Sequence, residues 1–245
     1  MAAEPGPVSA AQGGVWVYAV TAAAPARRLA GLIGVAGAPV RSVTEAGLSA
    51  AVSTVGEPPA TLLADLAATA AAGRAHHRVV THLAEAGPVV PIRLATVYPD
   101  DTTVAALLDR RRTQLGLMLD AFGDSQEWDV KIYLAPWAGP GDQEWSEVPA
   151  DGLSWPGSGP RLSLAEDRAE RIAAALSALA LATRRRPVSA PLPGTAPQVL
   201  FDGAYLLDAD RAREFASIVE SVPAEHVALR AELTGPWPPY SFADR

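Results

Sequence analysis

The sequence predicts an α+β protein of two domains, in which antiparallel or mixed sheets pack against helices. Each half of the chain combines a few short segments typical of strands with two longer segments that have helical spacing. The helical segments do not alternate strictly with the strands, as they would in a doubly wound parallel sheet. Several strands alternate apolar and charged residues, which indicates sheets that are covered on one face.

A domain boundary is expected near residue 135. Beyond that point the chain is rich in Pro, Gly and Trp and shows no hydrophobic period, which is typical of a linker or long loop. The expected division is a disordered tail over residues 1–14, an N-terminal α+β domain over 15–135, a linker over 136–160, and a C-terminal α+β domain with a Pro-rich tail over 161–245.

Hydrophobic patterns predict the elements of the N-terminal domain. The expected strands are residues 15–20, 40–43, 48–55, 89–94 and 127–134. The expected helices are residues 60–86 and 102–122. Pro91 favours the edge of a sheet because proline cannot donate to the hydrogen-bond ladder. Asp100 and Asp101 are expected to cap the second helix, which is the stronger interpretation than a cation site.

Two arginine runs require explanation. Arg110–Arg112 and Arg184–Arg186 are expected to be solvated helix residues, with contact to phosphate or an acidic partner as the alternative. Arg111 falls where the helical pattern expects an apolar residue. A buried paired arginine, a helix break and a partner surface all remain open for it.

In the C-terminal domain, Ser163 and Glu166 match the S-x-x-E capping box, which predicts the start of a helix that runs to about residue 183. Arg184–Arg186 would close this helix, favourably placed at the negative end of its dipole. A strand over residues 198–207, a helix over 210–222 and a strand over 227–233 are expected to follow.

Composition excludes several classes of function. The formal net charge is -7, which argues against nucleic acid as a partner. Cysteine is absent, so disulfides and thiolate sites are excluded, and a reducing, cytoplasmic location is expected. The N-terminus lacks the basic and apolar regions of a secretory signal, and no run approaches about 18 apolar residues, so no membrane partner is expected.

No motif for catalysis, a cofactor or a metal stands out. Metal-binding histidines on a helix need i, i+4 spacing, and His76, His77 and His82 do not have it. Gly31, Gly34 and Gly37 do not form a phosphate-binding pattern. We therefore expect no catalytic residue, no cofactor and no metal site. The competing class, a nucleotide- or metal-dependent enzyme, would be distinguished by specific ligand binding.

Four tryptophans lie outside periodic segments: Trp137, Trp145, Trp155 and Trp237. Large aromatic residues in Pro/Gly-rich segments either fold back on the core or serve as exposed anchors for a partner. Folding back is the better interpretation for Trp237.

Four segments together resemble the gas vesicle GvpF/GvpL family. These are VWVYAV at residues 15–20, GPVVPIRLATVY at 87–98, EWDVK at 127–131 and GPWPPYSF at 235–242. The last is the most specific, and their order spans nearly the whole chain. Leu94 and Ala95 stand where the family usually has Phe-Gly. The departure therefore affects the backbone turn that the family pattern implies at this point.

The resemblance implies two α+β domains, the first related to ferredoxin-like folds, without a cofactor or catalytic residues. It implies an accessory protein in gas vesicle assembly, cytoplasmic and gas vesicle associated, that contacts the hydrophobic shell protein GvpA and other accessory Gvp proteins. A minor structural component of the shell is the alternative. The candidate partner-binding residues are Pro91, Ile92, Arg93, Trp137, Trp145 and Trp155.

Overall fold

The computed structural model describes residues 13–22, 29–134, 158–188, 198–226 and 228–243. Contacts divide the chain into two compact units. The first comprises Met1–Ser125 together with Trp237–Arg245, and the second is Gln126–Pro236. This division differs from the expected ranges in two places: residues 126–134 group with the second unit, and the last nine residues of the chain group with the first.

The first unit is built on one antiparallel sheet. Its strands are β1 (Gly14–Ala22), β2 (Arg41–Glu45), β3 (Leu48–Val55), β4 (Val90–Pro91) and β5 (Val97–Tyr98). The order is β2-β3-β1-β4, and β5 also pairs with β1. All of these pairs are antiparallel. β4 therefore lies at the edge of the sheet, which confirms the position expected for the strand that contains Pro91.

The strand order confirms the ferredoxin-like expectation for the first unit. In that fold, the order second-third-first-fourth arises when two βαβ crossovers interlock. The second crossover contains α2 (Leu66–Ala84), but the described part of the first contains only a short 3-10 helix at Val35–Gly37. The first unit thus has the ferredoxin-like strand order, and no α-helix lies in residues 29–40 of its first crossover.

The hairpin of β2 and β3 closes through two residues. Glu45 pairs with Leu48, so Ala46 and Gly47 form the loop, and their φ angles are 51° and 80°. Positive φ at both positions is the type I′ geometry that matches the twist of paired strands. The two strands expected over residues 40–43 and 48–55 are thus paired as a hairpin.

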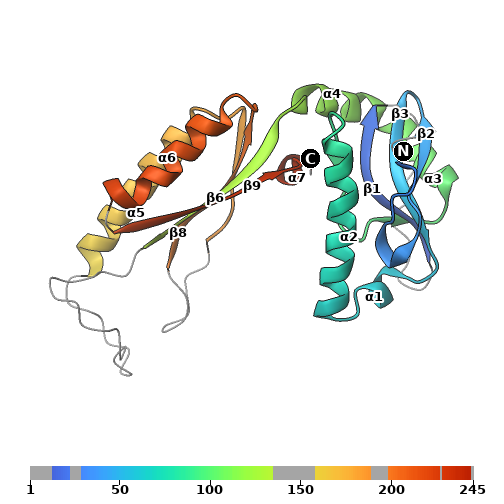
Figure 1. The fold of residues 1–245 in the computed structure, drawn as a ribbon, viewed down its shortest axis with the longest axis horizontal. Helices are drawn as coiled ribbons and strands as arrows, with labels where there is room; N and C mark the ends of the chain where they lie inside the picture. The colour runs from blue at the N-terminus through green and yellow to red at the C-terminus, as the bar shows by residue number, and fades with distance from the viewer. Residues whose placement is uncertain (1–12, 23–28, 135–157, 189–197, 227, 244–245) are drawn as a thin grey trace, which may run out of the picture. The chain divides into compact units, whose positions relative to one another are not determined.

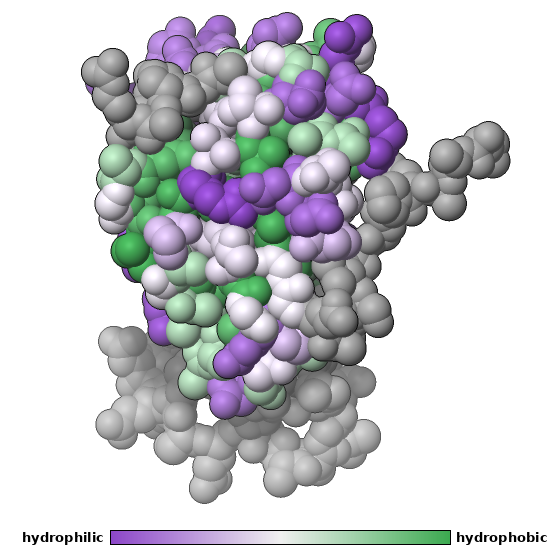
Figure 2. Space-filling view, turned by 90° about the vertical axis from the view of Figure 1, so that its right-hand side faces the viewer, coloured by the Kyte–Doolittle hydropathy of each residue, from purple (hydrophilic) through white to green (hydrophobic). Residues whose placement is uncertain are grey.

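Helices cover both faces of the first sheet (Figure 1). On one side α2 packs its apolar stripe against β1. On the other, α3 (Asp101–Arg110) packs against β2, β3 and β5, while α4 (Arg112–Phe122) packs against β1 and β4. Hydrophobic and hydrophilic residues are interspersed over the surface shown in Figure 2.

Both long helices expected in this unit are interrupted. The first is divided into α1 (Pro59–Leu62) and α2, because the Asp65 side chain accepts a hydrogen bond from the Ala68 N–H and begins a new helix. The second breaks at Arg111, whose φ and ψ of −99° and 11° end α3 and begin α4. Asp100 caps α3 through the Thr103 N–H at 2.7 Å, as expected.

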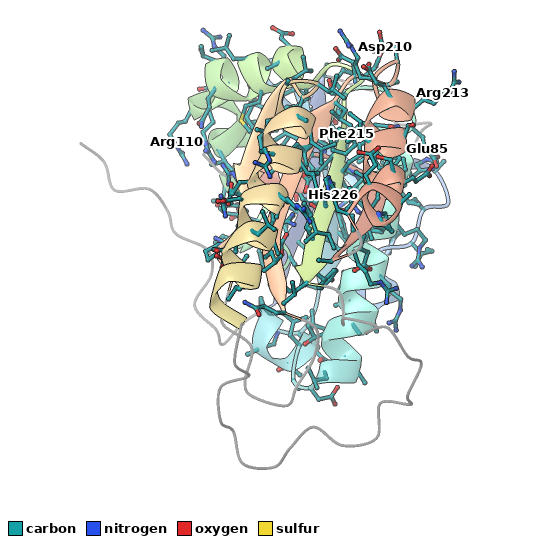
Figure 3. The ribbon with its side chains drawn as sticks, turned by 90° about the vertical axis from the view of Figure 1, so that its left-hand side faces the viewer. Glu85, Arg110, Asp210, Arg213, Phe215 and His226 are labelled. Atoms are coloured by element: carbon teal, nitrogen blue, oxygen red, sulfur yellow. The ribbon has the colours of Figure 1, made fainter. Side chains whose placement is uncertain are left out.

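The second unit contains β6 (Gln126–Leu134), α5 (Ser158–Ser177), β7 (Ala182–Arg185), β8 (Val199–Leu207), α6 (Ala212–Glu225) and β9 (Leu229–Trp237). Its strand order, β7-β8-β6-β9, is again second-third-first-fourth. This unit has the complete βαββαβ arrangement. Both helices cover the same face of the sheet, where Phe215 of α6 is fully buried and points inward while Arg213 points away (Figure 3).

The expected start and end of the first helix in this unit were wrong. α5 begins at Ser158, so Ser163 and Glu166 lie inside it and do not form a cap. It ends at Ser177, and Arg184 and Arg185 belong to β7, which pairs with β8. The arginine run is accommodated there because Arg185 forms an ion pair with Glu170 of α5.

Arg186 next to β7 meets three carboxylates on neighbouring strands. It lies 2.7 Å from Asp129, 3.1 Å from Asp202 and 3.5 Å from Glu127. The Glu127 side chain is only 3% exposed. Burial of a carboxylate is tolerated where a cation accompanies it. Two arginines of this run, Arg185 and Arg186, therefore have acidic partners within the same chain.

Candidate functional site

A pocket of about 430 Å³ lies in the first unit, between the sheet and α3. Its floor is apolar, and Val17, Val104 and Leu108 are all nearly or fully buried. Leu107 extends the apolar wall from α3, and Ala243 closes it from the C-terminal segment. Concave sites with apolar walls and a few polar groups are the usual form of a ligand or side-chain binding site.

Pro91, Ile92 and Arg93 all line this pocket. The structure therefore brings three of the six sequence-derived candidates together at one concave surface. The other three, Trp137, Trp145 and Trp155, lie outside the described residues. Pro91 is buried, Ile92 is half-buried and Arg93 is exposed.

The backbone of this edge segment is tied to β1. The Ile92 N–H donates to the Tyr18 carbonyl at 2.9 Å, and the Val17 N–H donates to the Thr96 carbonyl at 3.0 Å. Pro91 has no N–H to offer to an added strand. The helix α7 (Tyr240–Ala243) also contacts β4. The geometry therefore favours insertion of side chains into the pocket over addition of a strand to the edge.

His76 holds this segment against the core. The Trp16 Nε1–H donates to His76 Nδ1 at 3.0 Å, which requires that nitrogen to be unprotonated. The other ring nitrogen, Nε2, then carries the proton and donates to the Ile92 carbonyl at 2.9 Å. His76 thus connects β1, α2 and the pocket rim through one neutral imidazole.

Burial determines the charge state of His76, which is only 3% exposed. Desolvation lowers its pKa from 6.5 to about 4, with a smaller lowering from His77 and an opposing effect of the hydrogen bond to Ile92. The spacing of the histidines excluded His76 as a metal ligand, but the sequence prediction did not assign it to the core. Its position on the apolar stripe with Ala72, Val79 and Leu83 was the signal that it points inward.

The C-terminal segment packs on the outer side of α2. Tyr240 Oη lies 3.0 Å from His77 Nδ1, within hydrogen-bond distance. The His77 ring centroid lies 5.4 Å from that of Trp237 and 5.9 Å from that of Tyr240. Trp237 is 37% exposed, and Phe242 is buried. Residues 237–242 of the most specific sequence motif thus belong to the first unit, and the next residue, Ala243, lines the pocket.

The charged residues of the pocket lining are both arginines. Arg93 comes from the edge segment and Arg111 from the junction of α3 and α4, and none of the described residues that line the pocket is acidic. The Arg111 Nε–H donates to Gln114 Oε1 at 3.0 Å. Of the three explanations left open for Arg111, the structure supports the helix break.

Metal ligands and membrane-spanning helices also bear on the chemistry of the site. In the part of the chain that the structure describes, no group of three or more histidine and acidic side chains is placed to hold a metal ion. Within the same residues, no helix combines the length and apolarity needed to cross a bilayer.

The fold is similar to that of solved gas vesicle proteins. The crystal structure of GvpF from Anabaena sp. matches with a TM-score of 0.67 and 20% identity, covering 95% of this chain and 97% of that one. GvpF from Microcystis aeruginosa matches with a TM-score of 0.65 and 21% identity, covering 95% and 99%. At these identities the likeness establishes the fold.

Sequence comparison establishes the family. The family model described as gas vesicle synthesis protein GvpL/GvpF matches residues 14–148 and 160–244. Gas vesicle protein L of a Streptomyces species is 33% identical over 248 residues, covering 93% of this chain and 92% of the relative. Gas vesicle protein F of the same organism is 28% identical, covering 84% and 88%. The chain belongs to the GvpL/GvpF family of gas vesicle synthesis proteins and is involved in gas vesicle formation, which confirms the sequence resemblance.

Proposed function

We propose that this protein assists gas vesicle assembly by binding the hydrophobic shell protein GvpA at the pocket of the first unit. A shell subunit that must end with an apolar, gas-facing surface is prone to aggregate before assembly. A partner that covers part of that surface keeps the subunit available for addition to the shell. The observation that carries the proposal is the apolar pocket at Pro91–Arg93, at the edge of the sheet.

The pocket offers apolar surface that is accessible from outside the unit. Leu107 and Ile92 are half-buried, so a bound side chain would complete their burial. Burial of apolar surface contributes roughly 25 cal/mol per Å² before the costs of association are subtracted. A few aliphatic side chains of a shell subunit, inserted together, would supply a usable affinity.

A matched pair of leucine substitutions tests the proposal. Leu107→Asp places a carboxylate on the pocket wall, whereas Leu117→Asp places one on α4, where Leu117 is 65% exposed and does not line the pocket. GvpA should co-purify with wild type and with Leu117→Asp, and at least tenfold less with Leu107→Asp. Circular dichroism establishes that each variant is folded. Equal retention of GvpA by both variants would place its binding site elsewhere.

Deletion of residues 137–155 tests the other candidate surface. If the tryptophans there anchor the shell protein, this deletion abolishes co-purification while Leu107→Asp has no effect. Retention of the protein in washed gas vesicles would support the alternative, a minor structural component of the shell. Binding to other accessory Gvp proteins but never to GvpA would contradict the proposal.

A further inference from the structure

We infer that the pocket recognises a carboxylate together with an aliphatic side chain, so that its occupant is an acidic–aliphatic segment of a partner protein. The inference deepens the proposed function and rests on it, because it states the chemistry by which the same pocket selects its partner. It is carried by the charge and the placement of the groups that line the pocket.

The pocket lining is basic, whereas the protein as a whole is acidic. The whole chain has 27 acidic and 20 basic residues, whereas the lining, taken over the residues that the structure describes, has two arginines and no acidic residue. A concave surface with low-dielectric walls concentrates the field of such charges, which favours ligands of opposite sign. The pocket is therefore suited to an anionic group although the protein as a whole is acidic.

The two arginines belong to different walls. Arg93 comes from the sheet-edge segment and Arg111 from the helix junction, and the buried side chains of Val104 and Leu108 are apolar parts of the same lining. A ligand that reaches this floor with an aliphatic side chain brings its neighbouring residues into the range of one or both arginines. A carboxylate on such a neighbour would be matched by a guanidinium.

Arginine suits this role even where it already has partners. Its guanidinium presents five N–H groups in a planar fork, and a carboxylate accepts two of them at once. The Arg111 Nε–H is engaged by Gln114, and both arginines have other interactions within the protein. A ligand carboxylate is thus an additional acceptor. Phosphate-rich ligands such as nucleic acid fit less well, because the rest of the lining is largely apolar.

Peptide binding to the full chain tests the inference. The probes are a blocked pentapeptide of four leucine or alanine residues and one glutamate, the same peptide with glutamine in place of glutamate, and sodium octanoate. We expect the glutamate peptide to bind about fivefold more tightly than the glutamine peptide, which is the scale of one partly exposed ion pair. Amide chemical shifts should change at Ile92–Thr96 and along α3.

Arg93→Gln is the decisive variant, and Arg110→Gln is its matched control. Arg110 is exposed on α3 and does not line the pocket. The advantage of the glutamate peptide should be lost in Arg93→Gln combined with Arg111→Gln, reduced in Arg93→Gln, and kept in Arg110→Gln. Circular dichroism excludes unfolding of the double variant, which alters the helix junction. Equal binding of the two peptides to wild type would overturn the inference.

Two further outcomes separate this inference from the proposed function. If octanoate shifts the pocket amides and neither peptide does, the site takes a free fatty acid and the partner segment is wrong. If Leu107→Asp abolishes GvpA binding while the double arginine variant leaves it unchanged, carboxylate recognition fails and the proposed function stands. If Leu107→Asp leaves GvpA binding intact while the glutamate peptide binds as expected, the proposed function fails instead.

Discussion

Acidification should destabilise the first unit through His76. The imidazole is neutral and buried, and it accepts a hydrogen bond from Trp16 on Nδ1. Protonation of Nδ1 would place two donors face to face and a positive charge in the core, beside the Tyr18 ring at 5.3 Å. In the unfolded chain the imidazole is solvated and has neither cost. His76 therefore binds a proton more tightly in the unfolded state than in the folded state.

The size of the effect follows from the pKa of His76, which burial lowers from 6.5 to about 4. Above pH 6.5 the imidazole is neutral in both states and contributes no pH dependence. Between pH 6.5 and 4 only the unfolded state is protonated, so the free energy of unfolding falls by up to ~1.4 kcal/mol per pH unit. The total loss is about 3 kcal/mol, complete once the pH is below 4.

Urea-dependent hydrogen exchange of β1 and α2 amides measures this free energy for the first unit alone. Because carboxylates also titrate in this range, the quantity to follow is the difference between wild type and His76→Gln. His82→Gln, at an exposed position of the same helix, is the control. Wild type and His82→Gln should lose about 3 kcal/mol more than His76→Gln between pH 7 and 4. Parallel pH profiles for wild type and His76→Gln would refute the reasoning.

Three further predictions concern stability, each measured by urea unfolding. Ala95→Gly should stabilise the protein by ~0.5–1 kcal/mol, because Ala95 has a φ of 66° that glycine adopts without strain. The control, Ala72→Gly within helix α2, should instead destabilise the protein by about 1 kcal/mol. A loss of stability in Ala95→Gly would contradict the prediction. Arg186→Met should cost ~2–4 kcal/mol because it removes the cation shared by Glu127, Asp129 and Asp202, although Asp202 keeps an ion pair with Lys131 at 3.9 Å. Exposed Arg213→Met should stay within about 0.5 kcal/mol, and equal effects of the two substitutions would show that the cluster is unimportant. Tyr240→Phe should cost about 1 kcal/mol through the lost contact with His77, and unchanged stability would show that the hydroxyl does not hold the C-terminal segment.

Local pattern was sufficient for much of the fold. The alternation in β6 and the two-residue turn at Ala46 and Gly47 depend on residues close in sequence, and both were predictable. The strand β7 was not, because its run of arginines is poor in apolar residues. Arg185 of this strand is held by Glu170 of α5, and Arg186, the residue after it, is held by carboxylates of β6 and β8. Only the folded chain brings these partners near.

The candidate site was predictable in part. Pro91 indicated a sheet edge from its chemistry alone, and the resemblance drew attention to the same segment. The other pocket wall depends on where α3 ends. His76 could be assigned to the buried face of a helix, but its partner Trp16 is 60 residues away and the Ile92 carbonyl 16 residues away. Hydrogen bonds of that range leave no periodic signal in the sequence.

The comparison of the two units explains why the pocket lies in the first. Both share one strand order, but the second places both of its helices on one sheet face, whereas the first adds α3 and α4 on the face away from α2. A straight helix through Asp101–Phe122 would be about 33 Å long. The break at Arg111 lets α3 follow β2 and β3 while α4 follows β1 and β4. Leu107, Leu108 and Arg111 come from the last turn of α3 and the residue after it, so the break that displaces Arg111 from the apolar stripe also places it on the pocket wall.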